Sequence, residues 1–117
     1  MTKNILNPDD FKIIPGTTRI DYDAIKEARN IEKHRYSLTT AVEILQAAAV
    51  FQQPFITIGR TMEDGEVRHV HLAEHEGKLL QFVTTMREAD TVRIISLRPA
   101  SRKERNIYEL NRPKYII

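Results

Sequence analysis

Two stretches in the first half of the chain have apolar residues at helical spacing. In the first, capped by Asp23, apolar side chains recur at intervals of three, at Ile25, Ala28 and Ile31. This spacing predicts a helix of about 11 residues with a narrow apolar stripe. The second stretch begins at Leu38, after the candidate cap Ser37, and its dense apolar positions predict a buried helix that ends before Pro54.

The second half of the chain has the composition and turn signals of β-strands. Three strong strands are predicted at Val67–Leu72, Leu79–Thr85 and Thr91–Leu97, and two shorter ones at Thr18–Tyr22 and Phe55–Ile58. The strong strands are joined by short loops rich in glycine or acidic residues, which favour consecutive antiparallel hairpins. Ser101 and Glu104 then match a capping box, which predicts a last helix over residues 102–111, stopped by Pro113.

This order of elements predicts an α+β fold. N-terminal helices pack on a small antiparallel sheet, a meander of three to four strands, and a C-terminal helix follows. Turn dipeptides near the start indicate an irregular N-terminal extension at residues 1–17. A single domain is expected at residues 18–112, followed by a tail at 113–117.

Composition narrows the class of protein. A chain of 117 residues with 41% hydrophobic and 29% charged side chains is typical of one globular domain. It contains no cysteine, which excludes disulfides, cysteine-ligated zinc and thiolate catalysis. No apolar run approaches the ~20 residues of a membrane helix, and the start of the chain lacks the apolar core of a secretory signal, so a cytoplasmic protein is expected.

Charge is uneven along the chain, although the net charge is only +2. Residues 87–117 carry eight basic and four acidic side chains, the basic ones being Arg87, Arg93, Arg98, Arg102, Lys103, Arg105, Arg112 and Lys114. Such a cluster indicates a surface for a polyanion or an acidic partner. The alternative is a solvated helix face with ion pairs such as Arg105 with Glu109.

Histidines are the first candidates for chemistry. His69 and His71 share one face of a predicted strand and His75 lies just beyond, so they form either a metal triad or a half-exposed strand face. His34 ends the first helix between Lys33 and Arg35. Its cationic neighbours lower the pKa of the imidazole and the helix C-terminus raises it, so acid, base and helix-capping roles all stay open.

Arginines, a glutamate and a tyrosine are the other candidates. Arg98 at a strand end could clamp a phosphate or form an ion pair, and strict alternation places Arg93 on the opposite face unless a bulge intervenes. Glu66 and Arg68 could pair with each other or serve a site, and Tyr108 could donate to a phosphate or pack on the sheet. The sequence contains no P-loop, nucleophile elbow or metalloprotease motif.

The order of residues resembles the BrnT toxin family. The segment Ile20–Lys26, followed by Asn30 and Lys33-His34, is similar to the family's opening, aromatic–Asp–Pro–x–Lys, then Asn, then Lys-His. Further on, Gly65-Glu66-x-Arg68 resembles a G-E-x-R step. The stretch from Arg93 to Tyr108 resembles the most specific block, R-I-I-S-x-R-x-A-[ST]-x-x-E-R-x-x-Y. The resemblance covers about residues 20–110 in the right order.

The resemblance implies a RelE-like fold and a ribonuclease toxin of a type II toxin–antitoxin pair that arrests translation and growth. It implies an RNA substrate and, as partner, a BrnA-like ribbon-helix-helix antitoxin that masks the toxin. Operator DNA is contacted only through that antitoxin, and no cofactor, metal or membrane is implied.

The chain departs from the family pattern at several positions. Ala24 stands where proline is frequent, Arg35 where glycine is usual and Met86 where an acidic residue is common. Residues 1–17 have no counterpart in compact members of the family. These departures favour the alternative function, a non-catalytic nucleic-acid-binding or protein-interaction module derived from such a toxin.

Metal-free RNA cleavage needs a base for the ribose 2′-OH, cations for the charge on phosphorus and an acid for the leaving oxygen. With the family resemblance, the candidate catalytic residues are His34 as acid or base, Glu66 as base or orienter, Arg68, Arg93 and Arg98 as phosphate-stabilising cations, and Tyr108 for positioning. The candidate RNA-binding residues are Lys33, Arg87, Arg102, Lys103 and Arg105.

Overall fold

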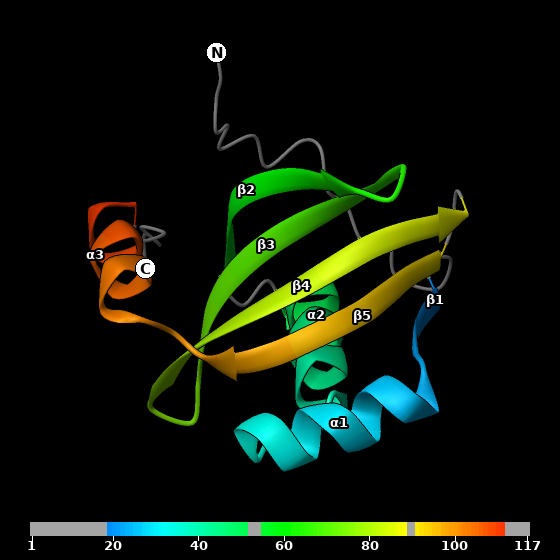
Figure 1. Cartoon of the computed structure of the whole chain (residues 1–117). Coiled ribbons are helices and arrows are strands. Elements are labelled where there is room, and N and C mark those ends of the chain that lie inside the picture. The colour runs from blue at the N-terminus through cyan, green and yellow to red at the C-terminus, as the bar shows by residue number, and fades with distance from the viewer. Residues whose placement is uncertain (1–18, 52–54, 89–90, 112–117) are drawn as a thin grey trace.

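A mixed five-stranded sheet forms the middle of the molecule (Figure 1). The computed structural model describes residues 19–51, 55–88 and 91–111, so the predicted extension and tail lie outside it. The strand order is β1-β5-β4-β3-β2, with β1 Arg19–Tyr22, β2 Phe55–Glu63, β3 Glu66–His75, β4 Lys78–Glu88 and β5 Thr91–Pro99. Strands β2 to β5 form the predicted antiparallel meander.

The predicted fold class is confirmed, and the sheet is larger than expected. Its first strand, β1, pairs in parallel with β5, which makes the sheet mixed and brings it to five strands instead of three to four. Three helices accompany the sheet, α1 Ala24–His34, α2 Thr39–Phe51 and α3 Arg102–Leu110. None of these helices, within the described ranges, is long and apolar enough to cross a membrane.

Local signals in the sequence account for where the helices begin. The Asp23 carboxylate accepts a hydrogen bond from a backbone N–H in the first turn of α1, as predicted. The predicted capping box also forms, because the Ser101 hydroxyl and the Glu104 carboxylate each accept from the other's backbone N–H. These caps fix the start of α1, which lines the candidate site, and of α3, whose Glu104 holds Arg98 of that site.

The start of α2 is held by a side chain from α1. The Glu27 carboxylate accepts from the Ser37 hydroxyl and from the Leu38 backbone N–H, both at 2.6 Å. The Ser37 hydroxyl accepts in turn from the Thr39 N–H at 3.1 Å, and the helix begins at Thr39, one residue later than predicted. Glu27 therefore ties the two N-terminal helices together and is turned away from the sheet face described below.

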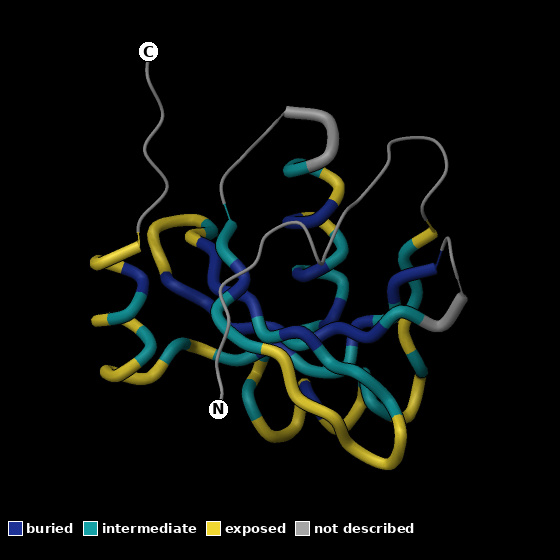
Figure 2. The backbone as a smooth tube through the Cα atoms, turned by 90° about the horizontal axis from the view of Figure 1, so that it is seen from above, coloured by how far each residue is buried: buried dark blue, intermediate teal, exposed yellow. Residues whose placement is uncertain are grey.

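Two hydrophobic clusters hold the helices to the sheet. The larger joins α2 to one face of the sheet and includes Leu38, Leu45, Phe82, Ile94 and Leu97. The smaller lies on the other face, where Tyr108 of α3 packs with Leu72 and Leu79. Figure 2 shows the buried stretches running through the sheet, whereas α3 is largely exposed. The second face is therefore covered by α3 at one end only.

A β-bulge in β5 changes which side chains share a face. Val83 pairs with Ser96 while the next residue of β4, Thr84, pairs with Ile94, so Ile95 is an extra residue in β5. Ile94 and Leu97 consequently both enter the α2 core, although three positions separate them. The same shift places Arg93 and Arg98 together on the opposite, open face of the sheet.

Candidate functional site

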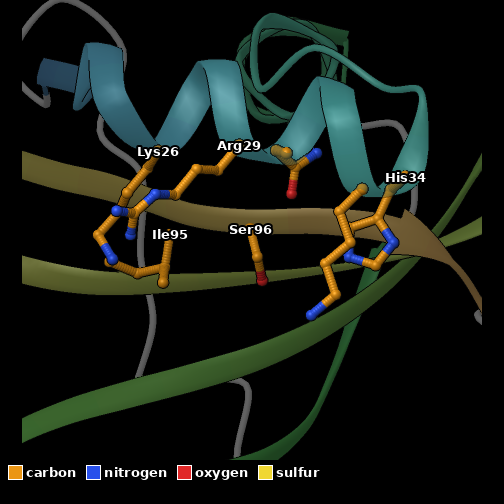
Figure 3. Close-up of a pocket in the computed structure, with 7 residues that line it drawn as sticks. Lys26, Arg29, His34, Ile95 and Ser96 are labelled. Carbon is orange, nitrogen blue, oxygen red and sulfur yellow. The ribbon is translucent and has the colours of Figure 1, made fainter.

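A groove runs between α1 and β5 on the open face of the sheet (Figure 3). It encloses about 280 Å³ and is lined by Lys26, Arg29, Asn30, Lys33 and His34 of α1 and by Ile95 and Ser96 of β5. The bulge contributes the floor, because both Ile95 and Ser96 face the groove. Among the described residues that line it, none is acidic and four are cations or a histidine.

Asn30 joins α1 to β5 and so shapes the groove. Its side-chain amide nitrogen donates to the backbone carbonyls of Leu97 and Tyr36, both at 2.8 Å. Its amide oxygen accepts from the Leu97 N–H at 3.0 Å. Asn30 is buried, and all three bonds tie a helix to a strand that is 67 residues distant in sequence or to the loop after α1. The sequence marked Asn30 only through the family resemblance.

His34 lies at one end of the groove, close to Arg98. Burial of the imidazole lowers the pKa of His34 below its ordinary value, and the positive charges of Lys33 and Arg98 lower it further. The net direction of the pKa, which the sequence left open, therefore favours the neutral ring. A neutral imidazole near neutral pH can accept a proton.

Arg98 forms an ion pair, which was one of the two roles predicted for it; the other was to bind a phosphate. Its guanidinium donates to Glu104 in a two-point ion pair, with the nearer contact at 2.8 Å, and to the Pro99 carbonyl at 3.0 Å. Gln81 of β4, which pairs with Arg98 in the sheet, donates to the same carboxylate. The pair leaves the guanidinium a third exposed, so it can still face a ligand while its position is fixed.

A second cationic group lies further along the open face. Arg93 and Arg68 both pair with Thr85 in the sheet, one from each neighbouring strand, so they flank that residue on the same face. Arg93 donates to Asp21 at 3.0 Å, and Arg68 donates to Glu63 at 3.2 Å and to Glu66 at 3.5 Å.

The candidate residues therefore gather in two groups on one face. Arg93 and Arg98 pair with Thr85 and Gln81, which are four positions apart in β4, so about 13 Å of strand separates the Arg68–Arg93 group from the His34–Arg98 group. The groove floor at Ile95 and Ser96 lies between them. Glu66 belongs to the second group, since its charge acts on Arg93 as well as on Arg68.

Tyr108 and the α3 cations lie elsewhere. Tyr108 is 2% exposed, packs in the smaller core cluster and donates its hydroxyl to Glu74 at 2.8 Å. Arg102, Lys103 and Arg105 are exposed on α3, outside the groove lining. Arg87 belongs to β4, but its side chain lies outside the described part of the chain. Of the predicted RNA-binding residues, Lys33 is the one that lines the groove.

Sequence reasoning missed two cations of the groove, Lys26 and Arg29. With Lys33 they are spaced at three and four positions, which places all three on one face of a helix. That spacing was the signal by which the sequence could have revealed a cationic face on the helix. It was obscured because the same helix carries the apolar stripe at Ile25 and Ile31, which the structure leaves exposed.

The histidines of β3 do not gather around a common point. His71 is fully buried and hydrogen-bonds through both ring nitrogens, to the hydroxyls of Thr57 and Thr84. His69 stacks beside it, and His75 lies near Glu76 at the end of the strand. Across the described residues, no group of three histidines or carboxylates could hold a metal ion.

These features define a small α+β protein with a groove suited to a polyanion and a histidine that favours its neutral form. The family model described as "Ribonuclease toxin, BrnT, of type II toxin-antitoxin system" matches residues 22–104, and the chain belongs to this family. The chain is similar in fold to the 1.1 Å crystal structure of the Brucella abortus ribonuclease toxin BrnT, with a TM-score of 0.52 and 22% identity. The match covers 74% of this chain and all of that one. Comparison with curated proteins gives no match.

Proposed function

We propose that this chain is an endoribonuclease that cleaves RNA by attack of a ribose 2′-OH on the adjacent phosphorus, without a metal. The observation that carries the proposal is the position of His34, with its lowered pKa, beside Arg98 at the end of a basic groove. Nucleases that use divalent metals hold them with carboxylates. The groove is lined instead by cations and by no acidic side chain among its described residues.

Each step of the reaction has a candidate group at this end of the groove. A ring nitrogen of His34 takes the 2′-OH proton as the 2′-oxygen bonds to phosphorus. Arg98, fixed by Glu104, stabilises the added negative charge on the phosphoryl oxygens. The bond from phosphorus to the 5′-oxygen then breaks, and Lys33 supplies a proton to that oxygen. The products are a 2′,3′-cyclic phosphate and a free 5′-OH.

The Arg68–Arg93 group offers a second possible catalytic arrangement. Glu66 lies near both Arg68 and Arg93, so it could act as the base with those arginines on the phosphate. Against this arrangement, three carboxylates, those of Asp21, Glu63 and Glu66, surround the two arginines, whereas the described groove lining at His34 contains no carboxylate. We therefore assign the chemistry to His34 and Arg98, and the binding of neighbouring phosphates to Arg68 and Arg93.

In the cell, such cleavage would stop translation and growth. We propose that the chain acts in the cytoplasm and that a cognate antitoxin of the ribbon-helix-helix class, similar to BrnA, neutralises it and carries any contact with operator DNA. Membership of a type II toxin–antitoxin family supports the existence of such a partner.

The test compares purified wild type with His34→Gln, Glu66→Gln and the control His75→Gln on single-stranded RNA, with and without EDTA. We expect wild type and His75→Gln to cleave equally in EDTA and to leave 2′,3′-cyclic phosphate ends, and His34→Gln to lose at least about a hundredfold in rate. A 2′-deoxy substitution at the cleaved nucleotide should abolish the reaction. Equal cleavage by His34→Gln and wild type would refute His34 as the base, and loss in Glu66→Gln alone would move the base to Glu66.

Expression in bacteria gives the second readout. We expect growth arrest with RNA fragmentation from wild type, relief by His34→Gln and relief by co-expression of the antitoxin. Folded wild-type protein that binds RNA but leaves it intact in every assay would support the alternative, a non-catalytic nucleic-acid-binding or interaction module.

A further inference from the structure

The α1 side of the groove concentrates like charges. Lys26, Arg29 and Lys33 follow one another at spacings of three and four residues and all line the groove. Like charges at these spacings destabilise a helix. Of the two glutamates of α1, Glu27 is bonded to the start of α2 and Glu32 does not line the groove, so the described lining holds no carboxylate beside these cations. The arrangement has a cost for folding, which a bound polyanion would offset.

The dimensions of this row suit a single nucleic-acid strand. Lys33 is seven positions after Lys26 on α1, which corresponds to a rise of about 10 Å along the helix. The row runs alongside the groove floor, which itself lies between the Arg68–Arg93 group and the His34–Arg98 group. Domains that recognise double-stranded RNA by contrast span about 16 base pairs. A strand lying along α1 would have cations at each end and a serine hydroxyl, Ser96, beneath it.

We propose that Lys26, Arg29 and Lys33 form a track for the backbone of single-stranded RNA next to the cleaved phosphate. This inference rests on the proposed function for the choice of RNA. Successive phosphates lie along the α1 cations, and the track leads the strand to His34 at its end (Figure 3). Lys26 and Arg29 are therefore binding residues that act on neighbouring nucleotides, distinct from the groups that move protons.

The first experiment measures binding without cleavage. The probe is a short single-stranded oligonucleotide with 2′-O-methyl riboses, which cannot supply a 2′-OH, and its affinity is followed by fluorescence anisotropy at several salt concentrations. The double variant Lys26→Gln/Arg29→Gln is compared with wild type and with Arg60→Gln/Lys78→Gln, which removes two exposed cations outside the groove. For single strands, the slope of log K against log salt falls by about 0.7 for each phosphate that the protein no longer neutralises.

We expect the groove variant to reduce that slope by about 1.4 and to bind at least about tenfold more weakly at low salt, while the control variant keeps the wild-type slope within error. Equal slopes and affinities for the two double variants would overturn the track. So would a groove variant that loses affinity for a blunt RNA duplex as much as for the single strand, since that result points to general electrostatics.

The second experiment measures cleavage of a long RNA and of a dinucleotide. The track predicts that Lys26→Gln/Arg29→Gln loses kcat/KM on the long RNA and keeps the wild-type value on the dinucleotide, which does not extend to Lys26 or Arg29. Equal losses on both substrates would place these residues in the chemistry and overturn the assignment. The two proposals fail separately. A wild type that cleaves nothing refutes the ribonuclease but leaves the binding slopes to decide the track, and active protein with unchanged slopes refutes the track alone.

Discussion

Arg98 donates two hydrogen bonds to Glu104, from Nη1 to Oε1 at 2.9 Å and from Nη2 to Oε2 at 2.8 Å. The Oε1 atom also accepts from the Ser101 N–H, so one carboxylate caps α3 and holds the guanidinium. Burial acts to raise the pKa of Glu104, but the hydrogen bonds and charge of Arg98, with the bonds from Ser101, outweigh it and leave that pKa below its usual value. The pair therefore stays ionised at neutral pH and fixes Arg98 near His34.

Removing the Arg98 charge should raise the pKa of His34. Arg98 is one of the causes that lower this pKa, so Arg98→Gln relieves part of the shift, and NMR titration of the imidazole measures it directly. If His34 acts as the base, the acid limb of the rate–pH profile moves to higher pH in the same variant. Arg105→Gln removes an exposed α3 arginine and should leave the His34 titration unchanged. An unshifted titration in Arg98→Gln would contradict the electrostatic contact.

His71 should make the fold less stable in mild acid. Burial lowers the pKa of His71 well below 6.5, and the neighbouring His69 lowers it further. The unfolded chain therefore takes up a proton near pH 6.5 that the folded chain refuses, and the free energy of unfolding falls as pH drops from 6.5 toward the folded pKa, by at most about 1.4 kcal/mol per pH unit. Urea unfolding between pH 7.5 and about 5 measures the slope.

Two variants distinguish the contribution of His71 to the acid sensitivity from that of the other histidines. His71→Gln can still hydrogen-bond to the threonines on either side but does not titrate, so its slope should flatten even if its stability at pH 7 is lower. His75→Gln, which removes a partly exposed histidine at the end of β3, is the control for loss of an imidazole. A slope unchanged by His71→Gln would place the acid sensitivity in another group.

The sequence predicted the helices, strands and turns better than it predicted which side chains share a face. Hairpins, caps and helix spacing are local signals, and the two turns at Asp64-Gly65 and Glu76-Gly77 have the positive φ angles expected of tight hairpins. The α+β order followed from these signals, whereas strict alternation placed Arg93 and Arg98 on opposite faces of their strand. The bulge at Ile95 was not visible, because nothing in the local pattern separates an extra residue from a strand that keeps strict alternation.

The ion-pair partners of the candidate side chains could not be predicted from the sequence either. Arg98 pairs with Glu104, six residues on, but Arg93 pairs with Asp21, 72 residues away, through the parallel strand β1. The apolar stripe of an amphipathic helix usually faces the core, yet Ile25 in the stripe of α1 is 64% exposed and the polar side meets β5 through Asn30. Tertiary contacts determine which acid each arginine pairs with and which side of α1 is buried. The sequence shows only that the charged and apolar residues are present.

Arg35 occupies a position where glycine should be more stable. It ends α1 in the left-handed region, with φ 64°, while its N–H donates to the Ile31 carbonyl. A side chain with a Cβ is strained there and glycine is not, so Arg35→Gly should raise the free energy of unfolding by about 0.5–1 kcal/mol. Arg35→Ala removes the same charge but keeps the Cβ, and urea unfolding should show no such gain. Equal gains would attribute the effect to charge instead.

Asn30→Ala should destabilise the protein and open the groove. The three hydrogen bonds of Asn30 satisfy the N–H and carbonyl of Leu97 and the carbonyl of Tyr36, and their loss leaves buried backbone groups without partners. We expect the free energy of unfolding to fall by about 3 kcal/mol, whereas Asn106→Ala on the exposed side of α3 should change it by less than about 0.5 kcal/mol. Because α1 is held to β5 at this point, affinity for single-stranded RNA should fall in the same variant under conditions where circular dichroism shows it folded. A variant that keeps both stability and RNA affinity would show that the groove does not depend on this link.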